Sequence, residues 1–207
     1  MKIQKTQLDN IEKVTLSHYD NNASSFWHGT KDHDVKQNYH AFLRQFPDGK
    51  SLDILDFGCG PGRDIHYFKS QGHRPVGLDG SKAFCDMALS YTGCEILHQQ
   101  FLSLSLPKER FDGIFANASL FHIPSQELPA VLLALHQTLR PGGVLFSSNP
   151  RGNAEGWSGQ RYGCYIEFEA TQQYLNAAGF TVIEHYYRPE GVPFAEQPWL
   201  AVVSTKR

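Results

Sequence analysis

The stretch Leu52–Asp64, LDILDFGCGPGRD, joins a short apolar segment to a loop with a glycine at every second position. An apolar run of this length is typical of a buried strand, and a glycine-rich turn after such a strand opens the next helix in nucleotide-binding α/β domains. The glycines Gly58, Gly60 and Gly62 follow a GxGxG spacing. This loop is therefore the first candidate for a ligand site.

Two common phosphate-binding patterns do not fit this loop. A P-loop requires a lysine after its last glycine, and Gly62 is followed by Arg63. The dinucleotide pattern GxGxxG requires a third glycine at the position of Arg63. Asp56, two residues before the first glycine, also places a carboxylate where a diphosphate would be repelled. The loop therefore favours a ligand that carries positive charge.

A second acid follows the next apolar segment. Asp79 comes directly after Pro75–Leu78, 23 positions beyond Asp56 (79 − 56). In this architecture an acid about 20 residues on, at the end of the second strand, binds the hydroxyl pair of a ribose. The expected ligand thus has a ribose, a positive group and no phosphate, which are the properties of S-adenosylmethionine.

Short apolar segments alternate with helix-like segments through the rest of the chain. The expected strands are 51–56, 75–78, 95–98, 111–117, 144–148, 180–187 and 199–204. This alternation predicts an α/β domain built on a mostly parallel seven-stranded sheet. The last two strands have no helix between them, so they should pair antiparallel. We expect residues 1–50 to form a cap of two or three short helices over the core, 51–207, in a single domain overall.

Composition and charge limit the kinds of partner that the protein is expected to bind. The formal net charge of −2 and the absence of a Lys/Arg run predict no nucleic-acid or membrane partner. The first ten residues lack the apolar segment of a secretory signal, and the longest apolar run is too short to cross a bilayer. The four cysteines form no CxxC pair, so we expect free thiols, no metal site and a cytoplasmic protein. The oligomeric state stays open.

Five segments, in this order, resemble the motifs of class I S-adenosylmethionine-dependent methyltransferases. They are LDFGCGPG (55–62), VGLDGS (76–81), QQFLSL (99–104), FDGIFANASLFHI (111–123) and LRPGGVLFSSNP (139–150). The resemblance covers about Leu52–Arg207 and implies a Rossmann-like, doubly wound fold with an N-terminal helical lid. The form GCGPGRD is similar to the branch that contains small-molecule and tellurite-resistance-type methyltransferases.

The resemblance also implies a cofactor site for S-adenosylmethionine and its product S-adenosylhomocysteine. Its residues are Tyr19, Asp56, Gly58, Cys59, Gly60, Asp79, Gly80, Ser81, Gln100, Phe101, Asn117 and Ala118. Asp56 belongs to the methionine end, Asp79 to the ribose, and Asn117 to the methyl group, with Tyr19 closing over the cofactor. Gln100 departs from the family, which commonly has an Asp there, although its amide oxygen can still accept from the adenine amino group.

The substrate side should lie above the glycine loop. The expected substrate residues are Trp27, Arg63, Arg151, Trp157 and Tyr162. His122, five residues after Asn117, is the candidate catalytic residue, and its alternative role is to cap the following turn. The long glycine-rich stretch 149–163 is either a substrate lid or a surface excursion. Arg63 and Asp64 either face the substrate or pair with each other.

These features predict in-line methyl transfer to a small-molecule acceptor, with a general base needed only if the nucleophile arrives protonated. A methyltransferase of a protein or RNA is an alternative. An adenine-N6 DNA enzyme is disfavoured because Asn117 is followed by Ala-Ser-Leu and not by Pro-Pro-aromatic. A nicotinamide-dependent oxidoreductase is opposed by the missing third glycine and by Asp56. A non-catalytic cofactor-binding module also stays open, as does the identity of the acceptor.

Overall fold

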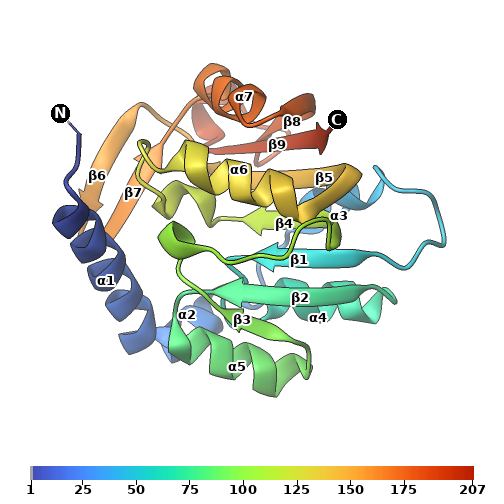
Figure 1. The fold of residues 1–207 in the computed structure, drawn as a ribbon, viewed down its shortest axis with the longest axis horizontal. Coiled ribbons are helices and arrows are strands. Elements are labelled where there is room, and N and C mark those ends of the chain that lie inside the picture. Colours follow the sequence, from blue (N-terminus) through green and yellow to red (C-terminus); the bar gives the residue numbers. More distant parts are fainter. Residues whose placement is uncertain (1) are drawn as a thin grey trace.

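The computed structural model describes residues 2–207, in which seven strands form one sheet (Figure 1). Its spatial order is β3-β2-β1-β4-β5-β9-β8. The strands are β1 Asp53–Phe57, β2 Arg74–Asp79, β3 Ile96–His98, β4 Phe111–Asn117, β5 Leu139–Pro150, β8 Phe180–Arg188 and β9 Trp199–Lys206. Strands β1 to β5 pair in parallel, whereas β9 is antiparallel to both β5 and β8. The predicted mostly parallel seven-stranded sheet with an antiparallel last strand is confirmed.

Helices cover both faces of this sheet. They are α1 Lys5–Asn21, α2 Ala23–Thr30, α3 Lys36–Leu43, α4 Arg63–Ser70, α5 Lys82–Thr92, α6 Leu128–Thr138 and α7 Phe168–Ala177, with single 3-10 turns η1 Phe101–Ser103, η2 Leu120–His122 and η3 Phe194–Glu196. Successive side chains of a strand point to opposite faces. Leu55 and Phe57 therefore join the core under α6 and α7, whereas Ile54 joins the core under α3 and α4.

The N-terminal helices do not pack as one unit. Tyr39 and Phe42 of α3 are buried against Phe115 and Phe146 of the central strands, so α3 belongs to the core. In contrast, α1 and α2 extend across the edge toward which β1, β2 and β4 point (Figure 1). None of the helices within residues 2–207 combines the length and the apolar character that crossing a membrane requires.

The stretch 149–163, expected as a loop, contains a hairpin. Strand β6, Ala154–Ser158, pairs antiparallel with β7, Arg161–Tyr165. The hairpin lies beside α1 (Figure 1), where the backbone N–H of Tyr162 donates to Thr15 Oγ1 over 3.2 Å. Its frequent glycines obscure the alternation that predicts strands. Together α1 and the hairpin cover the carboxyl edge of the sheet.

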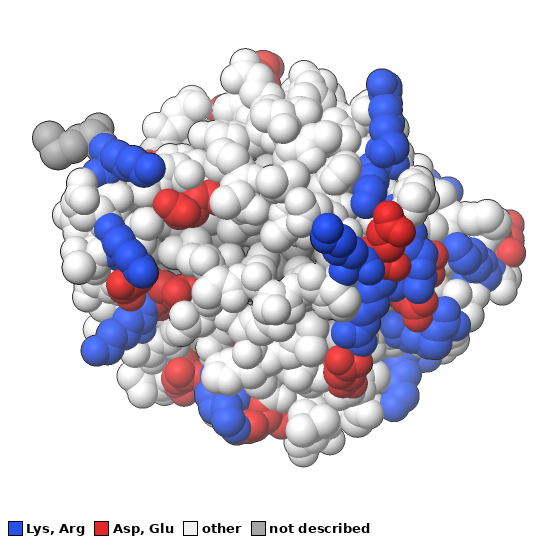
Figure 2. All heavy atoms as spheres, viewed as in Figure 1, with Lys and Arg blue, Asp and Glu red and all other residues white. Residues whose placement is uncertain are grey.

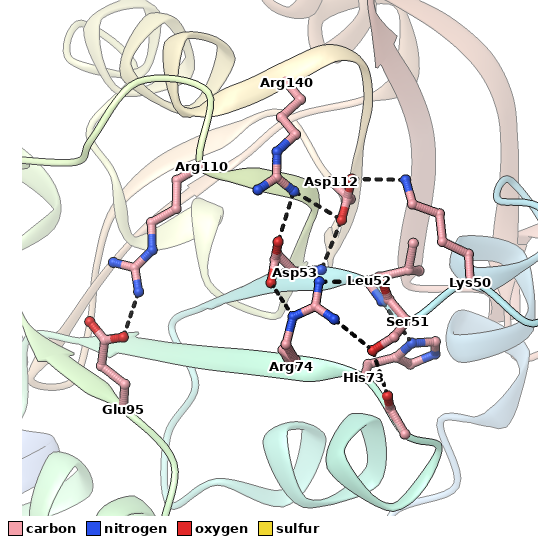
Figure 3. A network of polar contacts seen from close by, with 11 residues as sticks. Lys50, Ser51, Leu52, Asp53, His73, Arg74, Glu95, Arg110, Asp112 and Arg140 are labelled. Atoms are coloured by element: carbon pink, nitrogen blue, oxygen red, sulfur yellow. Dashed lines mark hydrogen bonds and ion pairs between the residues drawn. The ribbon is translucent and has the colours of Figure 1, made fainter.

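Charges gather at the opposite, amino edge of the sheet (Figure 2, right-hand side). There Asp112 contacts Lys50 and Arg140, each with a nitrogen–oxygen distance of 3.0 Å, and Asp53 contacts Arg140 at 2.9 Å and Arg74 at 2.7 Å (Figure 3). This chain of alternating charges ties the beginnings of β1, β2, β4 and β5 together.

Candidate active site

A cavity of about 600 Å³ lies at the carboxyl ends of β1, β2 and β4, beneath α1 and α2. This volume falls within the range of small-molecule sites. The residues expected from the sequence that line it are Tyr19, Trp27, Gly58, Cys59, Gly60, Arg63, Asp79, Gly80, Phe101, Asn117, Ala118 and His122. The expected residues that do not line it are Asp56, Ser81, Gln100, Arg151, Trp157 and Tyr162.

The glycine loop is held against the end of β2. The backbone N–H groups of Gly58 and Cys59 donate to the Leu78 carbonyl oxygen at 2.8 and 3.0 Å. Gly58 has φ +78°, and a Cβ added there would lie 2.3 Å from Cβ of Ser119. A Cβ added to Gly60 would meet only Phe26, at 3.8 Å. Glycine is therefore required at 58 by packing, whereas Gly60 opens the backbone to the cavity.

Asp79 is anchored by backbone donors. Its Oδ2 accepts from the Gly60 N–H at 2.9 Å and its Oδ1 from the Ser81 N–H at 2.8 Å. Burial raises the pKa of Asp79 to about 6, and these N–H groups oppose the rise. Each carboxylate oxygen can accept a further hydrogen bond. Above pH 6 Asp79 thus offers a fixed, charged acceptor to a ligand hydroxyl.

Asp56 lies behind the loop. It is only 1% exposed, and its Oδ2 has no hydrogen-bond partner among residues 2–207. Burial, followed by the charge of Asp64, raises the pKa of Asp56. The implied contact between Asp56 and the methionine end is therefore not provided by a side chain in the cavity. Asp56 can influence a ligand only through its electric field and through the loop above it.

Arg63 and Asp64 pair with each other, and both line the cavity. The Arg63 Nε donates to Asp64 Oδ1 at 2.7 Å, and its Nη2 donates to Oδ2 at 3.0 Å. Asp64 also accepts from the Tyr39 hydroxyl at 2.5 Å and from Asn117 Nδ2 at 3.2 Å. Asn38 Nδ2 in turn donates to Asn117 Oδ1 at 3.0 Å. This network fixes the Asn117 amide at the end of β4.

Tyr19 and His122 form a hydrogen-bonded pair in the cavity. His122 Nδ1 lies 2.7 Å from the carbonyl oxygen of Tyr162. Since a carbonyl only accepts, Nδ1 carries the proton and Nε2 is the acceptor. The Tyr19 hydroxyl, 2.7 Å from Nε2, is therefore the donor. Burial lowers the pKa of His122 to about 4, which keeps the imidazole neutral at pH 7.

The remaining expected substrate and cofactor residues do not line the cavity and have other places in the fold. Arg151 braces the loop before β9, because its Nε donates to the Gln197 carbonyl at 2.7 Å and its Nη1 to Glu167 at 3.0 Å. Trp157 is 47% exposed on the hairpin. Tyr162 contributes its backbone carbonyl oxygen, which accepts a hydrogen bond from His122 Nδ1. Ser81 is the N-cap of α5, and Gln100 is an exposed residue before η1.

The cavity also contains residues that the motifs do not indicate. Phe26 and Phe84 surround Tyr19, with ring-centroid distances of 5.6 and 5.5 Å. Arg188 and Trp199, from β8 and β9, line the far end. Both residues lie outside every motif, so the sequence gives little indication of them. Because β8 runs parallel to β5, its last residue, Arg188, reaches the same edge of the sheet as the end of β5. Within residues 2–207 no group of three or more His, Cys, Asp or Glu is placed to hold a metal ion.

The sequence of this chain is similar to those of known methyltransferases. Residues 54–143 match a family model described as a methyltransferase domain. An uncharacterized methyltransferase of Schizosaccharomyces pombe is 29% identical over 166 residues, which cover 77% of this chain and 60% of that protein. A ubiquinone biosynthesis O-methyltransferase of Pasteurella multocida is 23% identical over 171 residues, covering 73% of this chain and 70% of that one. The chain thus spans about 60% of the first relative's length.

Solved structures share the fold. A 1,6-didemethyltoxoflavin-N1-methyltransferase of Burkholderia thailandensis, crystallised with 1,6-didemethyltoxoflavin and S-adenosylhomocysteine, has a TM-score of 0.78 at 23% identity and covers 100% of this chain and 93% of that one. A TehB-like methyltransferase of Corynebacterium glutamicum has a TM-score of 0.72 at 19% identity, covering 92% of this chain and 99% of that one. With the strand order and the glycine loop, these matches show that residues 54–143 form a methyltransferase domain and that the chain has the fold of the class I S-adenosylmethionine-dependent methyltransferases.

Proposed function

We propose that the protein transfers the methyl group of S-adenosylmethionine to a small-molecule acceptor. The observation that carries this proposal is the shared cavity, in which the glycine loop and Asp79 meet Asn117, Tyr19 and His122. The cavity therefore joins a cofactor end, at β1 and β2, to an acceptor end that extends toward β8 and β9. When bound, the cofactor supplies a methyl group activated by a sulfonium.

The residues at the cofactor end fit this ligand. Gly60 leaves open space where a side chain would otherwise lie, and Asp79 offers fixed acceptors for ribose hydroxyls. Phe101, which stacks on Phe57 with a centroid distance of 4.3 Å, provides an apolar wall in the place implied for the adenine. Asp64 and Asp79 line the cavity and can place negative charge near a sulfonium, whereas burial, which raises the pKa of Asp56, favours the neutral form of that carboxyl.

Tyr19 and His122 are suited to remove a proton from the acceptor. The Tyr19 oxygen takes the proton of an acceptor O–H or N–H while its own proton passes to His122 Nε2. The resulting imidazolium keeps its Nδ1–H on the Tyr162 carbonyl. A His with a depressed pKa is a weak base, so this step serves acceptors whose acidity rises as methylation proceeds. For an acceptor that arrives deprotonated, the same pair only orients it.

Enclosure favours a small acceptor over a macromolecule. Helices α1 and α2 and the β6–β7 hairpin cover the carboxyl edge, so the acceptor must fit in the space that the cofactor leaves within about 600 Å³. Closing the site in this way also excludes water from the nucleophile. The names of the Pasteurella and Burkholderia proteins, an O-methyltransferase of ubiquinone biosynthesis and an N1-methyltransferase of a small heterocycle, support the same class of acceptor.

Calorimetric titration with S-adenosylmethionine and S-adenosylhomocysteine tests the cofactor assignment. Both should bind the unmodified protein, and Asp79→Asn should weaken both by about 10- to 100-fold, because an amide replaces a charged double acceptor. Asp86→Asn is the matched control, since Asp86 is an exposed acid on α5 whose ion pair is with Lys82. Absence of binding to the unmodified protein, or full affinity in Asp79→Asn, would contradict the proposal.

A further inference from the structure

The arginines divide into two groups by their ion pairs. Six of the nine contact a carboxylate, namely Arg44, Arg63, Arg74, Arg110, Arg140 and Arg151. Within residues 2–207, Arg161, Arg188 and the C-terminal Arg207 have no carboxylate within 4.0 Å. Arg161 and Arg188 both line the cavity. The cavity therefore contains two positive charges that the folded chain does not neutralise by contact.

Arg188 differs from Arg151 in how its guanidinium is used. Arg151 donates to two backbone carbonyls and to Glu167, which accounts for Nε and both terminal nitrogens. Arg188 is half-buried, yet the one hydrogen bond of its side chain within the described chain runs from Nη2 to the Asp34 carbonyl at 3.1 Å. Burial lowers the pKa of Arg188, and the charge of Arg63 acts in the same direction, against Tyr186 and Asp34. An uncompensated guanidinium of this kind gains from an anionic partner.

The sheet register places Arg188 away from the cofactor end. Arg188 pairs with Trp199 across β8 and β9, and Trp199 pairs with Pro150 at the end of β5. Asp79 lies on the other side of β1, at the end of β2. With the cofactor between Gly58 and Asp79, the β8 end of the same cavity is left to the acceptor.

Three other charged residues of the cavity wall, Arg63, Asp64 and Asp34, already have hydrogen-bond partners. Arg63 uses Nε and Nη2 on Asp64 and Nη1 on the Thr30 carbonyl. Asp64 accepts from Arg63, Tyr39 and Asn117, and Asp34 Oδ1 accepts from the backbone N–H of Lys36. Arg188 is thus the wall cation with free donors at the acceptor end. Arg161, on the hairpin, lies near Tyr19 of α1 and is the second arginine of the cavity without a carboxylate in contact within residues 2–207.

We propose, on the basis of the function proposed above, that the acceptor is a small organic anion whose carboxylate or phosphate is bound by Arg188, with Arg161 as a second cation from the hairpin. This arrangement selects the acceptor by charge. It also holds the anionic group at the β8 end, so that the nucleophilic atom lies toward Asn117 and Tyr19.

The test uses protein saturated with S-adenosylhomocysteine and measures thermal shifts with matched probes. Acetate, succinate, benzoate and phenyl phosphate are each compared with acetamide, succinamide, benzamide and phenol. At least one anion should stabilise the protein more than its neutral counterpart. Its apparent affinity should fall by about 10- to 100-fold in Arg188→Gln and by a smaller factor in Arg161→Gln. Arg188→Lys should retain part of the preference, and Arg44→Gln, outside the cavity, should retain all of it.

The outcomes separate this inference from the function on which it rests. If S-adenosylhomocysteine does not bind the unmodified protein, the proposed function fails. If it binds but no anion is preferred over its neutral counterpart, or if both Gln variants keep the preference unchanged, only the anionic acceptor is overturned. If Arg188→Gln weakens S-adenosylhomocysteine itself more than tenfold, Arg188 serves the carboxylate of the cofactor, and the acceptor assignment is likewise overturned. Melting of the ligand-free variants shows that they are folded.

Discussion

The two edges of the sheet carry similar charges and use them differently. At the amino edge, Asp53 and Asp112 share Arg140 and each has a second cation, so the charges there neutralise one another at the surface. At the carboxyl edge Arg63 pairs with Asp64, but among residues 2–207 Asp56 and Asp79 are buried without a cation in contact and Arg188 has no carboxylate in contact. We infer from this difference that the ion pairs of the amino edge support the fold, whereas Asp79 and Arg188, which line the cavity, are available to a ligand.

Breaking the glycine loop should have the largest effect at the carboxyl edge. Gly58→Ala adds a Cβ at 2.3 Å from Ser119 Cβ to a residue with φ +78°. We expect loss of detectable S-adenosylhomocysteine binding and a free energy of unfolding lower by about 2–5 kcal/mol, from strain and overpacking together. Gly49→Ala is the control, because Gly49 has φ +74° but no atom within 4 Å of the added Cβ. Equal effects in the two variants, by urea unfolding and calorimetry, would show that packing at Gly58 is unimportant.

Removing the hydrogen-bonded pair should affect turnover more than binding. For an acceptor that must lose a proton, Tyr19→Phe and His122→Ala should each lower kcat by about 10²- to 10⁴-fold. The affinity for S-adenosylhomocysteine should change much less in His122→Ala, because the His122 ring contacts Tyr19 and the hairpin. Because the imidazole is neutral above its pKa of about 4, kcat should not decline between pH 8 and 6 in the unmodified protein. A decline centred near pH 6.5 would show that His122 titrates as an ordinary exposed histidine.

The ionisation of Asp79 should give cofactor binding its own pH dependence. Burial raises the pKa of Asp79 to about 6 in the free protein, and the ionised form is the better acceptor for ribose hydroxyls. Lowering the pH from 7 to 5 protonates this carboxyl, so the Kd of S-adenosylhomocysteine should rise about tenfold over that range. Asp79→Asn should remove this dependence as well as weaken binding. A pH-independent Kd in the unmodified protein would argue against direct use of the carboxylate.

The amino edge should tolerate change with the smallest effect. Arg140→Gln removes contacts to Asp53 and Asp112, but Arg140 is 40% exposed, so solvent screens the loss. The free energy of unfolding should fall by about 0.5–1 kcal/mol, less in high salt, with no change in the Kd of S-adenosylhomocysteine. Urea unfolding at two salt concentrations measures the first effect and calorimetry the second. A weakened cofactor affinity would show that the two edges are coupled.

Prediction from the sequence succeeded where the determinants are local. The glycine spacing and the apolar runs placed β1, β2 and β4, and the missing helix before the last strand predicted its antiparallel pairing. Prediction from the sequence was less informative for residues 149–163, where frequent glycines conceal a hairpin. The helices before residue 50 were expected as one cap, and the structure divides them between the cavity and the core because Tyr39 and Phe42 find partners on the sheet.

The sequence by itself determined the sheet, the glycine loop and the acid at the end of β2, because each depends on the spacing of residues that are near neighbours in the chain. Only the tertiary structure decided which charged side chains remain free. Asp56 is hidden behind its own loop, Arg151 is consumed by Glu167, and Arg188 is left in the cavity. The hydrogen bond between Tyr19 and His122, which lie 103 positions apart in the sequence, was likewise decided by the tertiary structure. Such outcomes depend on which distant groups compete for each hydrogen bond, and no local pattern records that competition.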